Sequence, residues 1–129
     1  MQTHKQNKGD KYELKALHYL QRKGLTLIAK NFHSRFGEVD LIMQDNDTIV
    51  FIEVRYREST SHGSASESVT PRKQQKIIKT AKRFLSDRNL WDNNVRFDVV
   101  AISPIPTRFF CRHNVDWIPS AFCVPETKL

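Results

Sequence analysis

The sequence is poor in cysteine and has no long apolar run. It contains two cysteines, Cys111 and Cys123, without the second pair or the histidine spacing that a zinc site needs. No stretch approaches the length of a transmembrane helix, and the polar segment 1–11 lacks the apolar core of a signal peptide. We therefore expect no membrane partner, reduced thiols and a cytoplasmic location.

Acidic residues are in the minority. The chain has 21 lysines and arginines against 14 aspartates and glutamates, which gives a formal net charge of +7. A basic surface attracts polyanions, so nucleic acid is the expected partner, with DNA favoured. A length of 129 residues suffices for one domain with its own core. We expect a single domain over residues 1–129, with flexible tails at 1–8 and 124–129.

The most informative feature is a predicted β-hairpin that carries two acids. Two apolar runs, 36–44 and 48–57, flank a short polar link. If this link forms a two-residue turn at 46–47, Asp40 lies directly opposite Glu53. Like charges that face each other destabilise a ladder unless a partner neutralises them, and a divalent cation is the obvious partner. A slip of one residue in one strand would separate the two acids.

The same register sorts the other side chains of the hairpin. One face is wholly apolar and carries Val39, Leu41, Met43, Val50, Ile52 and Val54. The other face is apolar near the turn, with Ile42, Ile49 and Phe51, and charged toward the open end, with Glu38, Asp40, Glu53, Arg55 and Arg57. Strands that are apolar on both faces are typical of a central hairpin covered by helices.

The pattern as a whole predicts the order αβββαββ, an α/β fold with a central mixed β-sheet flanked by helices. The expected elements are a helix at 10–24, strands at 25–33, 36–44 and 48–57, a helix opened by Thr70-Pro71, and strands at 95–103 and 109–118 around a Pro104/Pro106 turn. Asp98 lies inside a strand, where an ion pair with a neighbouring arginine is expected. Segment 58–70 is longer than the usual connection, which suggests a lid or a substrate-contacting loop.

Glu13 has two readings. Asp10-x-x-Glu13 matches a capping box, in which the glutamate is purely structural. Glu13 also falls on the apolar stripe of the first helix, so a carboxylate facing the core could reach the charged end of the sheet. On spacing alone both readings remain open.

The second helix carries a basic stripe made of Arg72, Lys73, Lys76, Lys79 and Arg83. Cations in the first helical turn oppose the helix dipole, so Arg72 and Lys73 lack a local electrostatic reason to be there. A phosphate would supply one, because helix N-termini favour anions. The stripe and Arg57 are therefore candidate nucleic-acid-binding residues; the alternative is an ordinary solvated face.

The acids of the hairpin are candidate metal ligands. Asp40, Glu53 and the backbone carbonyl of Val54 offer oxygen atoms near one point, and Mg²⁺ or Mn²⁺ prefers such ligands and retains waters when one or two carboxylates bind it. A metal held there can polarise a phosphodiester and activate a bound water. Arg55 can clamp a phosphate but cannot act as a general base. The alternative is a structural cluster in which nearby arginines neutralise the acids.

Several motifs carry a family resemblance. They are Gly9-x3-Glu13-x2-Ala16-x2-Tyr19-Leu20, Asn31-Phe32, Gly37-Glu38-Val39-Asp40-Leu41-Ile42, Val50-Phe51-Ile52-Glu53-Val54-Arg55-Tyr56-Arg57, Lys73-Gln74, Arg96-Phe97-Asp98-Val99-Val100 and Trp117-Ile118. In order and spacing they resemble the YraN family of small bacterial proteins, over residues 9–122. That family looks like a branch of the PD-(D/E)XK, restriction-endonuclease-like nucleases and is similar to archaeal Holliday-junction resolvases.

The resemblance implies a Mg²⁺- or Mn²⁺-dependent endonuclease that acts on DNA, branched or structured. It matches Asp40 and Glu53 to the two motif acids, Val54 to the variable position and Arg55 to the motif lysine. It also matches Glu13 to the helix-borne glutamate that assists the metal site in the resolvases.

The departure from the superfamily pattern is Arg55, because the motif ends in lysine. Two expectations follow: a nuclease with altered water activation, or a non-catalytic nucleic-acid-binding module on a nuclease fold. Cutting both strands of a symmetric junction would call for a two-fold homodimer, for which no residue of the sequence identifies an interface.

Overall fold

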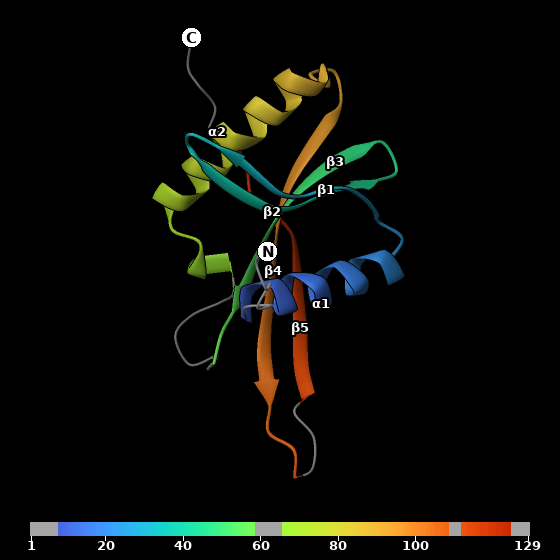
Figure 1. The fold of residues 1–129 in the computed structure, drawn as a ribbon, viewed down its shortest axis with the longest axis vertical. Coiled ribbons are helices and arrows are strands. Elements are labelled where there is room, and N and C mark those ends of the chain that lie inside the picture. The colour runs from blue at the N-terminus through green and yellow to red at the C-terminus, as the bar shows by residue number, and fades with distance from the viewer. Residues whose placement is uncertain (1–7, 59–65, 109–111, 125–129) are drawn as a thin grey trace, which may run out of the picture.

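The computed structural model describes residues 8–58, 66–108 and 112–124 and consists of two helices packed on one five-stranded sheet (Figure 1). In chain order the elements are α1 (Lys8–Arg22), β1 (Thr26–Ser34), β2 (Gly37–Asp45), β3 (Thr48–Tyr56), the short 3-10 helix η1 (Ser66–Ser68), α2 (Pro71–Arg88), β4 (Asn94–Ile105) and β5 (Arg112–Phe122). The predicted order of helices and strands is confirmed. No helix within these ranges is long and apolar enough to cross a membrane.

The sheet is mixed. Its strands lie in the order β1-β2-β3-β4-β5, and every neighbouring pair is antiparallel except β3 and β4, which run parallel. A parallel pair needs a crossover connection, and α2 lies in the connection from β3 to β4. The expected α/β class with a central mixed sheet is therefore confirmed.

The β2–β3 hairpin has the predicted register. Leu41 pairs with Ile52, and the following pairs keep this register up to the two-residue turn. Asn46, in the turn, has a φ of 55°, the left-handed conformation that such turns require and that asparagine tolerates. The ladder with β2 stops at Leu41–Ile52, whereas β3 stays paired with β4 as far as Tyr56. β2 and β3 therefore separate at the end that carries the acids.

Two apolar clusters fill the space between the sheet and the helices, one on each face. The cluster under α1 contains Tyr12, Ala16, Leu17, Leu20, Leu25, Leu41, Met43, Val50, Ile52, Val100 and Ile102. The cluster under α2 contains Val39, Ile42, Ile49, Phe51, Val69, Ile77, Ile78, Ala81, Phe84, Leu85, Phe97 and Val99. The predicted alternation is thus wrong for Val39, which packs under α2 and not with Leu41. The change of face occurs between Leu41 and Val39, whose partners on β1, Lys30 and Phe32, flank Asn31 with its φ of 51°.

The start of α2 is as predicted, but the start of α1 is not. Thr70 caps α2, since its Oγ1 accepts the N–H of Lys73 at 3.2 Å, and Pro71 opens the helix. In contrast, α1 already includes Lys8. Asp10 therefore lies inside the first turn and is not the N-cap, so the capping-box reading of Glu13 is wrong.

The expected flexible tails are mostly outside the described residues. Of the tails 1–8 and 124–129, the structure describes only Lys8, which belongs to α1, and Val124. Residues 59–65 of the predicted loop also lie outside the described residues. Pro104 is part of β4 rather than of a turn. This is allowed because β3 ends at Tyr56, opposite Ile102, so no ladder on that side needs an N–H at position 104.

A buried ion pair ties the far strands together. Asp98 on β4 is fully buried, and Arg96 Nε, Trp117 Nε1 and the backbone N–H of Ser120 each donate to it at 2.9 Å. Arg96 Nη1 also donates to Asp45, beside the β2–β3 turn, at 3.0 Å. The expected ion pair of Asp98 is thus confirmed, and it links β5 and the hairpin turn to β4.

We predict that Asp98→Ala lowers the free energy of unfolding by about 3–5 kcal/mol, because Arg96 would lose the partner that compensates its partial burial. Urea unfolding followed by circular dichroism measures the loss. Asp87→Ala is the matched control, since Asp87 forms only an exposed 3.1 Å pair with Arg83 one turn away and should cost about 0.5 kcal/mol or less. Equal losses in the two variants would contradict a structural role for the buried network.

Candidate functional site

The separation of β2 and β3 is bridged by a side chain. Asp40 Oδ2 accepts a hydrogen bond of 2.8 Å from the backbone N–H of Val54. Because the β2–β3 ladder has already ended at Leu41–Ile52, this carboxylate takes the place that a backbone carbonyl of β2 would otherwise occupy. Asp40 is thereby fixed at the open end of the hairpin, next to Glu53.

Glu53 is the buried partner of Asp40. It is 5% exposed, and its carboxyl group lies within hydrogen-bonding reach of that of Asp40. Two cations approach the same oxygen, Glu53 Oε2: Arg55 Nη2 and Lys73 Nζ, each at 3.6 Å. Both distances exceed that of a hydrogen bond, so the two cations attract Glu53 without binding it directly. The ladder ends before the predicted pair of Asp40 with Glu53, but the two carboxyl groups are in contact.

Glu13 approaches the same centre from α1. Its carboxyl group interacts electrostatically with Asp40 and accepts a hydrogen bond from the side chain of Asn31. Asn31 has a φ of 51° inside β1, a conformation that costs energy for a residue other than glycine and that is common at functional sites. Glu13 thus faces the acids, as the functional reading of its position required.

Burial and the neighbouring acid raise the pKa of both Glu53 and Glu13. Burial, the hydrogen bond to Asp40 and the charge of Asp40 raise the pKa of Glu53 to about 8, although Lys73 and Arg55 oppose the rise. Burial and the charge of Asp40 likewise raise the pKa of Glu13 to about 7, against the effect of the hydrogen bond from Asn31. Near neutral pH the centre therefore holds protons that a nearby positive charge would displace.

A small cavity opens beside Glu13 and Asp40, and Glu53 does not line it. It has a volume of about 190 Å³ and is lined by Gly9, Tyr12, Glu13, Asp40, Val54 and Tyr56. Tyr12 and Tyr56 are stacked at its side, with ring centroids 4.3 Å apart. The cavity can hold a small ion with several waters but not a large cofactor.

The residues at this centre fit a hard divalent cation. The described part of the chain contains no group of three or more His, Cys, Asp or Glu side chains placed to hold a metal. That excludes a cage built from protein side chains alone, but Mg²⁺ is commonly held by one or two carboxylates with waters and substrate phosphates as the other ligands. Arg55 Nε is also buried without a hydrogen-bond partner among the described residues. A buried donor without a partner, beside carboxyl groups of raised pKa, indicates a site that a ligand would complete.

The relatives of the chain identify its family. Residues 12–102 match the model of the "Uncharacterised protein family UPF0102". The chain belongs to the UPF0102 family. A UPF0102 protein of Pseudomonas syringae is 45% identical over 119 residues, which cover 92% of this chain and 94% of the relative. UPF0102 proteins of Vibrio cholerae (43% over 117 residues, 89% and 91%) and Nitrosococcus oceani (44% over 123 residues, 95% of each) are similarly close. The YraN-like resemblance is thus confirmed, and the UPF0102 segment includes every predicted site residue.

The members of the predicted basic stripe of this UPF0102 protein differ in exposure and in ion-pair partners. Lys73 points to the acids, whereas Lys76 and Lys79 are exposed on α2 farther along. Arg83 forms a 3.1 Å pair with Asp87 and is partly neutralised. Arg72 is exposed in the first turn of α2, and the backbone N–H of Arg57 donates to Ile102 where β3 has ended. The stripe thus runs from the acid centre along α2, with its far end paired.

Two residues at the centre were not predicted as parts of it. Lys73 was expected only to bind nucleic acid, and its approach to Glu53 depends on how α2 packs on the sheet, which spacing does not reveal. Asn31 stood in a recognised motif, but nothing in the local pattern indicated a positive φ inside a strand. The asparagine itself was the available signal, because asparagine tolerates the left-handed conformation better than most residues.

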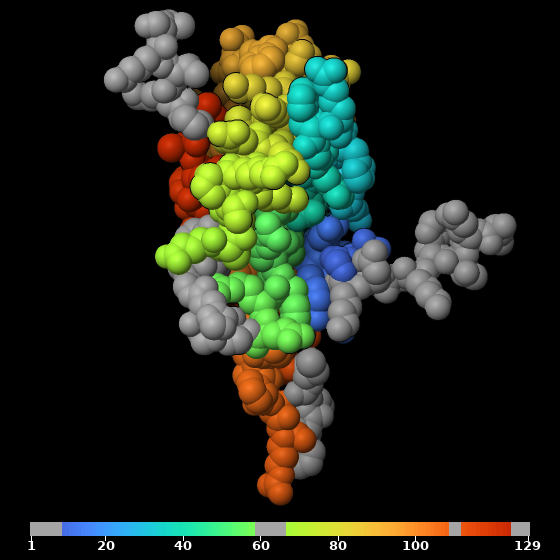
Figure 2. All heavy atoms as spheres, turned by 90° about the vertical axis from the view of Figure 1, so that its left-hand side faces the viewer, coloured from blue at the N-terminus to red at the C-terminus, as the bar shows by residue number. Residues whose placement is uncertain are grey.

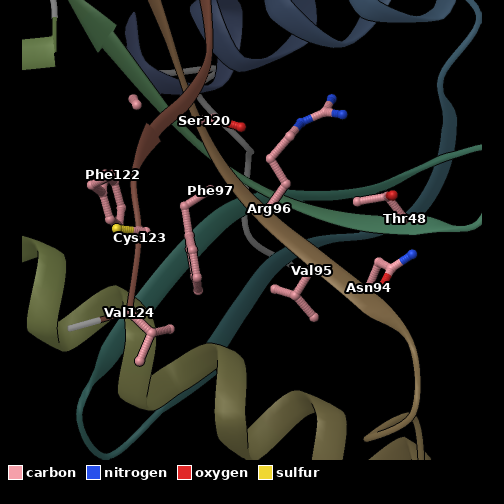
Figure 3. A pocket seen from close by; sticks show the side chains of 10 residues that line it. Thr48, Asn94, Val95, Arg96, Phe97, Ser120, Phe122, Cys123 and Val124 are labelled. Atoms are coloured by element: carbon pink, nitrogen blue, oxygen red, sulfur yellow. The ribbon is translucent and has the colours of Figure 1, made fainter. Parts of the chain in front are cut away.

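A larger hollow lies elsewhere on the described surface and has no acid in its lining. Its volume is about 700 Å³, and it lies where β4 begins and β5 ends, lined by Thr48, Asn94, Val95, Arg96, Phe97, Ser120, Ala121, Phe122, Cys123 and Val124 (Figure 3). Arg96, its one charged lining residue, is already bound to Asp98 and Asp45. The smaller cavity at Asp40 therefore remains the better candidate for chemistry.

We predict that the protein loses stability between pH 5 and pH 8 and that Glu53→Gln reduces this loss by about 1–3 kcal/mol. The pKa of Glu53 is raised in the folded state from 4.5 to about 8. In this window the folded state therefore binds more protons than the unfolded state, and stability falls as pH rises. Urea unfolding at a series of pH values measures the slope. A glutamine variant with the slope of the wild type would contradict the raised pKa.

Proposed function

We propose that this UPF0102 protein is a metal-dependent endonuclease that hydrolyses phosphodiester bonds in DNA, with branched or structured DNA as its substrate. The observation that carries the proposal is the contact of Asp40 with Glu53 at the open end of the hairpin, with raised pKa values for Glu53 and Glu13. Two cations, Arg55 and Lys73, form ion pairs of 3.6 Å with Glu53 and are placed to meet a phosphate.

The architecture supports a restriction-endonuclease-like core. The elements α1 to β4 follow the order αβββαβ, and the two acids lie on adjacent central strands of a mixed sheet. We infer that Asp40 and Glu53 are the two motif acids of a PD-(D/E)XK site, similar to that of archaeal Holliday-junction resolvases. Cutting both strands of a symmetric junction would then require two copies related by a two-fold axis.

The chain's own residues would divide the work as follows. Asp40, Glu53 and the main-chain oxygen of Val54 would hold Mg²⁺ or Mn²⁺, which when bound supplies Lewis-acid polarisation of the phosphate and a more acidic water. Arg55 would donate to the phosphate oxygens as negative charge develops on them. Glu13, across the cavity from β3, would orient a water through its carboxylate.

Arg55 does not prevent hydrolysis, but it changes how the site must work. A guanidinium does not give up its proton in proteins, so it cannot serve as the base that a lysine could become. Lys73 brings an ammonium group from α2 to the same carboxylate. The centre therefore keeps two cations for the phosphate, one from the strand and one from the helix.

We predict metal-dependent cleavage of DNA that Asp40→Asn reduces about 100-fold or more, a loss typical for a group that stabilises developing charge. The assay incubates the purified protein with junction, flap, duplex and single-stranded DNA, with Mg²⁺, with Mn²⁺ and with EDTA. Asp47→Asn is the matched control. Asp47 is exposed in the turn of the same hairpin, and its substitution removes the same charge. Cleavage that persists in EDTA, or that survives Asp40→Asn, would contradict the proposal.

A second function is favoured by one observation. Arg55 and Lys73 both lie near Glu53, so the acids could be neutralised internally, and the protein would then be a non-catalytic nucleic-acid-binding module on a nuclease fold. Calorimetric titration with Mn²⁺ separates the two functions. The nuclease requires heat of binding that Asp40→Asn removes, whereas the module binds DNA in EDTA, takes up no Mn²⁺ and cleaves none of the four substrates.

A further inference from the structure

The turn that joins β1 and β2 is fastened to α2. Ser34 Oγ and Thr80 Oγ1 are 2.8 Å apart, and the N–H of Phe36 donates to Ser34 Oγ at 3.1 Å. Thr80 is fully buried under this contact. Gly37 has a φ of 155°, and a Cβ at this position would lie 3.5 Å from Cβ of Lys76. The backbone of the turn therefore lies directly on the helix, and its side chains are held in a defined place beside α2.

Two cations of this region are held by an aromatic ring. The guanidinium carbon of Arg35 lies 4.9 Å, and Nζ of Lys79 lies 5.6 Å, from the ring centroid of Phe36. Both are cation–π contacts, which attract a cation without cancelling its charge. Neither cation forms an ion pair with a carboxylate of the described residues. We refer to Arg35, Phe36 and Lys79 as the Phe36 clamp.

The Phe36 clamp is aligned with the acid centre. Lys73, Lys76 and Lys79 follow at intervals of three along α2, beginning 3.6 Å from Glu53. With a rise of about 1.5 Å per residue, Lys79 lies about 9 Å farther along the helix than Lys73. Measured along the axis of a DNA duplex, one strand advances about 3.4 Å per nucleotide, so a duplex whose axis follows α2 advances about three nucleotides over this distance. In Figure 2, α2 (yellow), the β1–β2 region (cyan) and the end of β3 (green) share one face of the molecule.

We propose that the Phe36 clamp binds the sugar–phosphate backbone of the substrate strand about three nucleotides from the scissile phosphate. The inference rests on the proposed nuclease function and extends it to the course of the strand. Nucleic acid is the occupant that the charges favour, because its phosphates repeat along a line as the cations do. Contacts to phosphates fix register but do not read sequence, so the clamp should act equally on unrelated sequences.

We predict that Arg35→Gln and Lys79→Gln each reduce the salt dependence of DNA binding. The slope of log K against log salt concentration should fall in magnitude by about 0.9 for each lost phosphate contact. Fluorescence anisotropy of a labelled DNA duplex in EDTA, over about 50 to 200 mM KCl, measures this slope without cleavage. Phe36→Leu leaves the charge unchanged and should weaken binding about two- to fivefold, because the ring no longer holds the cations.

Lys23→Gln is the matched control. Nζ of Lys23 lies 5.4 Å from the ring of Tyr19, so this variant removes the same charge from the same kind of contact, just beyond α1 on the other face of the sheet. It should leave the slope unchanged. If Lys23→Gln lowers the slope as much as Arg35→Gln, or if Arg35→Gln has no effect, the clamp is overturned in favour of diffuse attraction.

The position along the strand has its own test. Once the cleavage position is mapped, substrates can be made with fewer than about three nucleotides on one side of it. On the side that reaches the clamp, this shortening should give the wild type and Arg35→Gln equal affinities for the DNA. A difference that persists after shortening on either side would overturn the proposed course of the strand.

The two proposals fail separately. Metal-dependent cleavage together with an unaltered Arg35→Gln slope would end the clamp alone. Altered slopes together with an absence of cleavage in every metal would end the nuclease alone.

Discussion

The hydrogen bond from the N–H of Val54 to Asp40 Oδ2 is the contact on which the centre depends. A backbone donor in the interior of a sheet must find an acceptor, and β2 no longer supplies one beyond Leu41. Asp40 meets this need with its side chain, which places a carboxylate in the gap between two strands. The same bond fixes the distance between Asp40 and Glu53, so a structural requirement and the proposed chemistry are met by one residue.

The rest of the fold closes this gap from both sides. The parallel ladder with β4 keeps β3 straight as far as Tyr56, so Glu53 and Arg55 stay in place although β2 has diverged. Helix α1 covers one face of the sheet and brings Glu13, while α2 covers the other and brings Lys73. Asp40 is thus contacted from both sides, by Glu13 of α1 and by Glu53 of β3, and the cations of β3 and α2 approach Glu53. None of these elements could be shifted by a residue without dispersing the group.

Local chemistry was enough to predict the hairpin but not its surroundings. The two-residue turn at Asn46 determines the register, and from it the contact of Asp40 with Glu53 follows. The N-cap of α2 and the partner of Asp98 were likewise predictable, because each depends on neighbours in sequence. The approach of Lys73 depends on tertiary packing, and the face taken by Val39 depends on the irregularity of the sheet at Asn31. Nuclease activity and the metal remain predictions.

The proposed metal would neutralise the acid pair better than the cations of the centre do. Arg55 and Lys73 lower the pKa of Glu53, yet it is raised to about 8, because burial and Asp40 outweigh them. Both cations approach Oε2 of Glu53 alone and leave its contact with Asp40 without a shared positive charge. A divalent ion between the two carboxylates would interact with both at once and at shorter distance, and Coulomb energy grows as distance shrinks. The cations already present would then be free to meet the phosphates of the substrate.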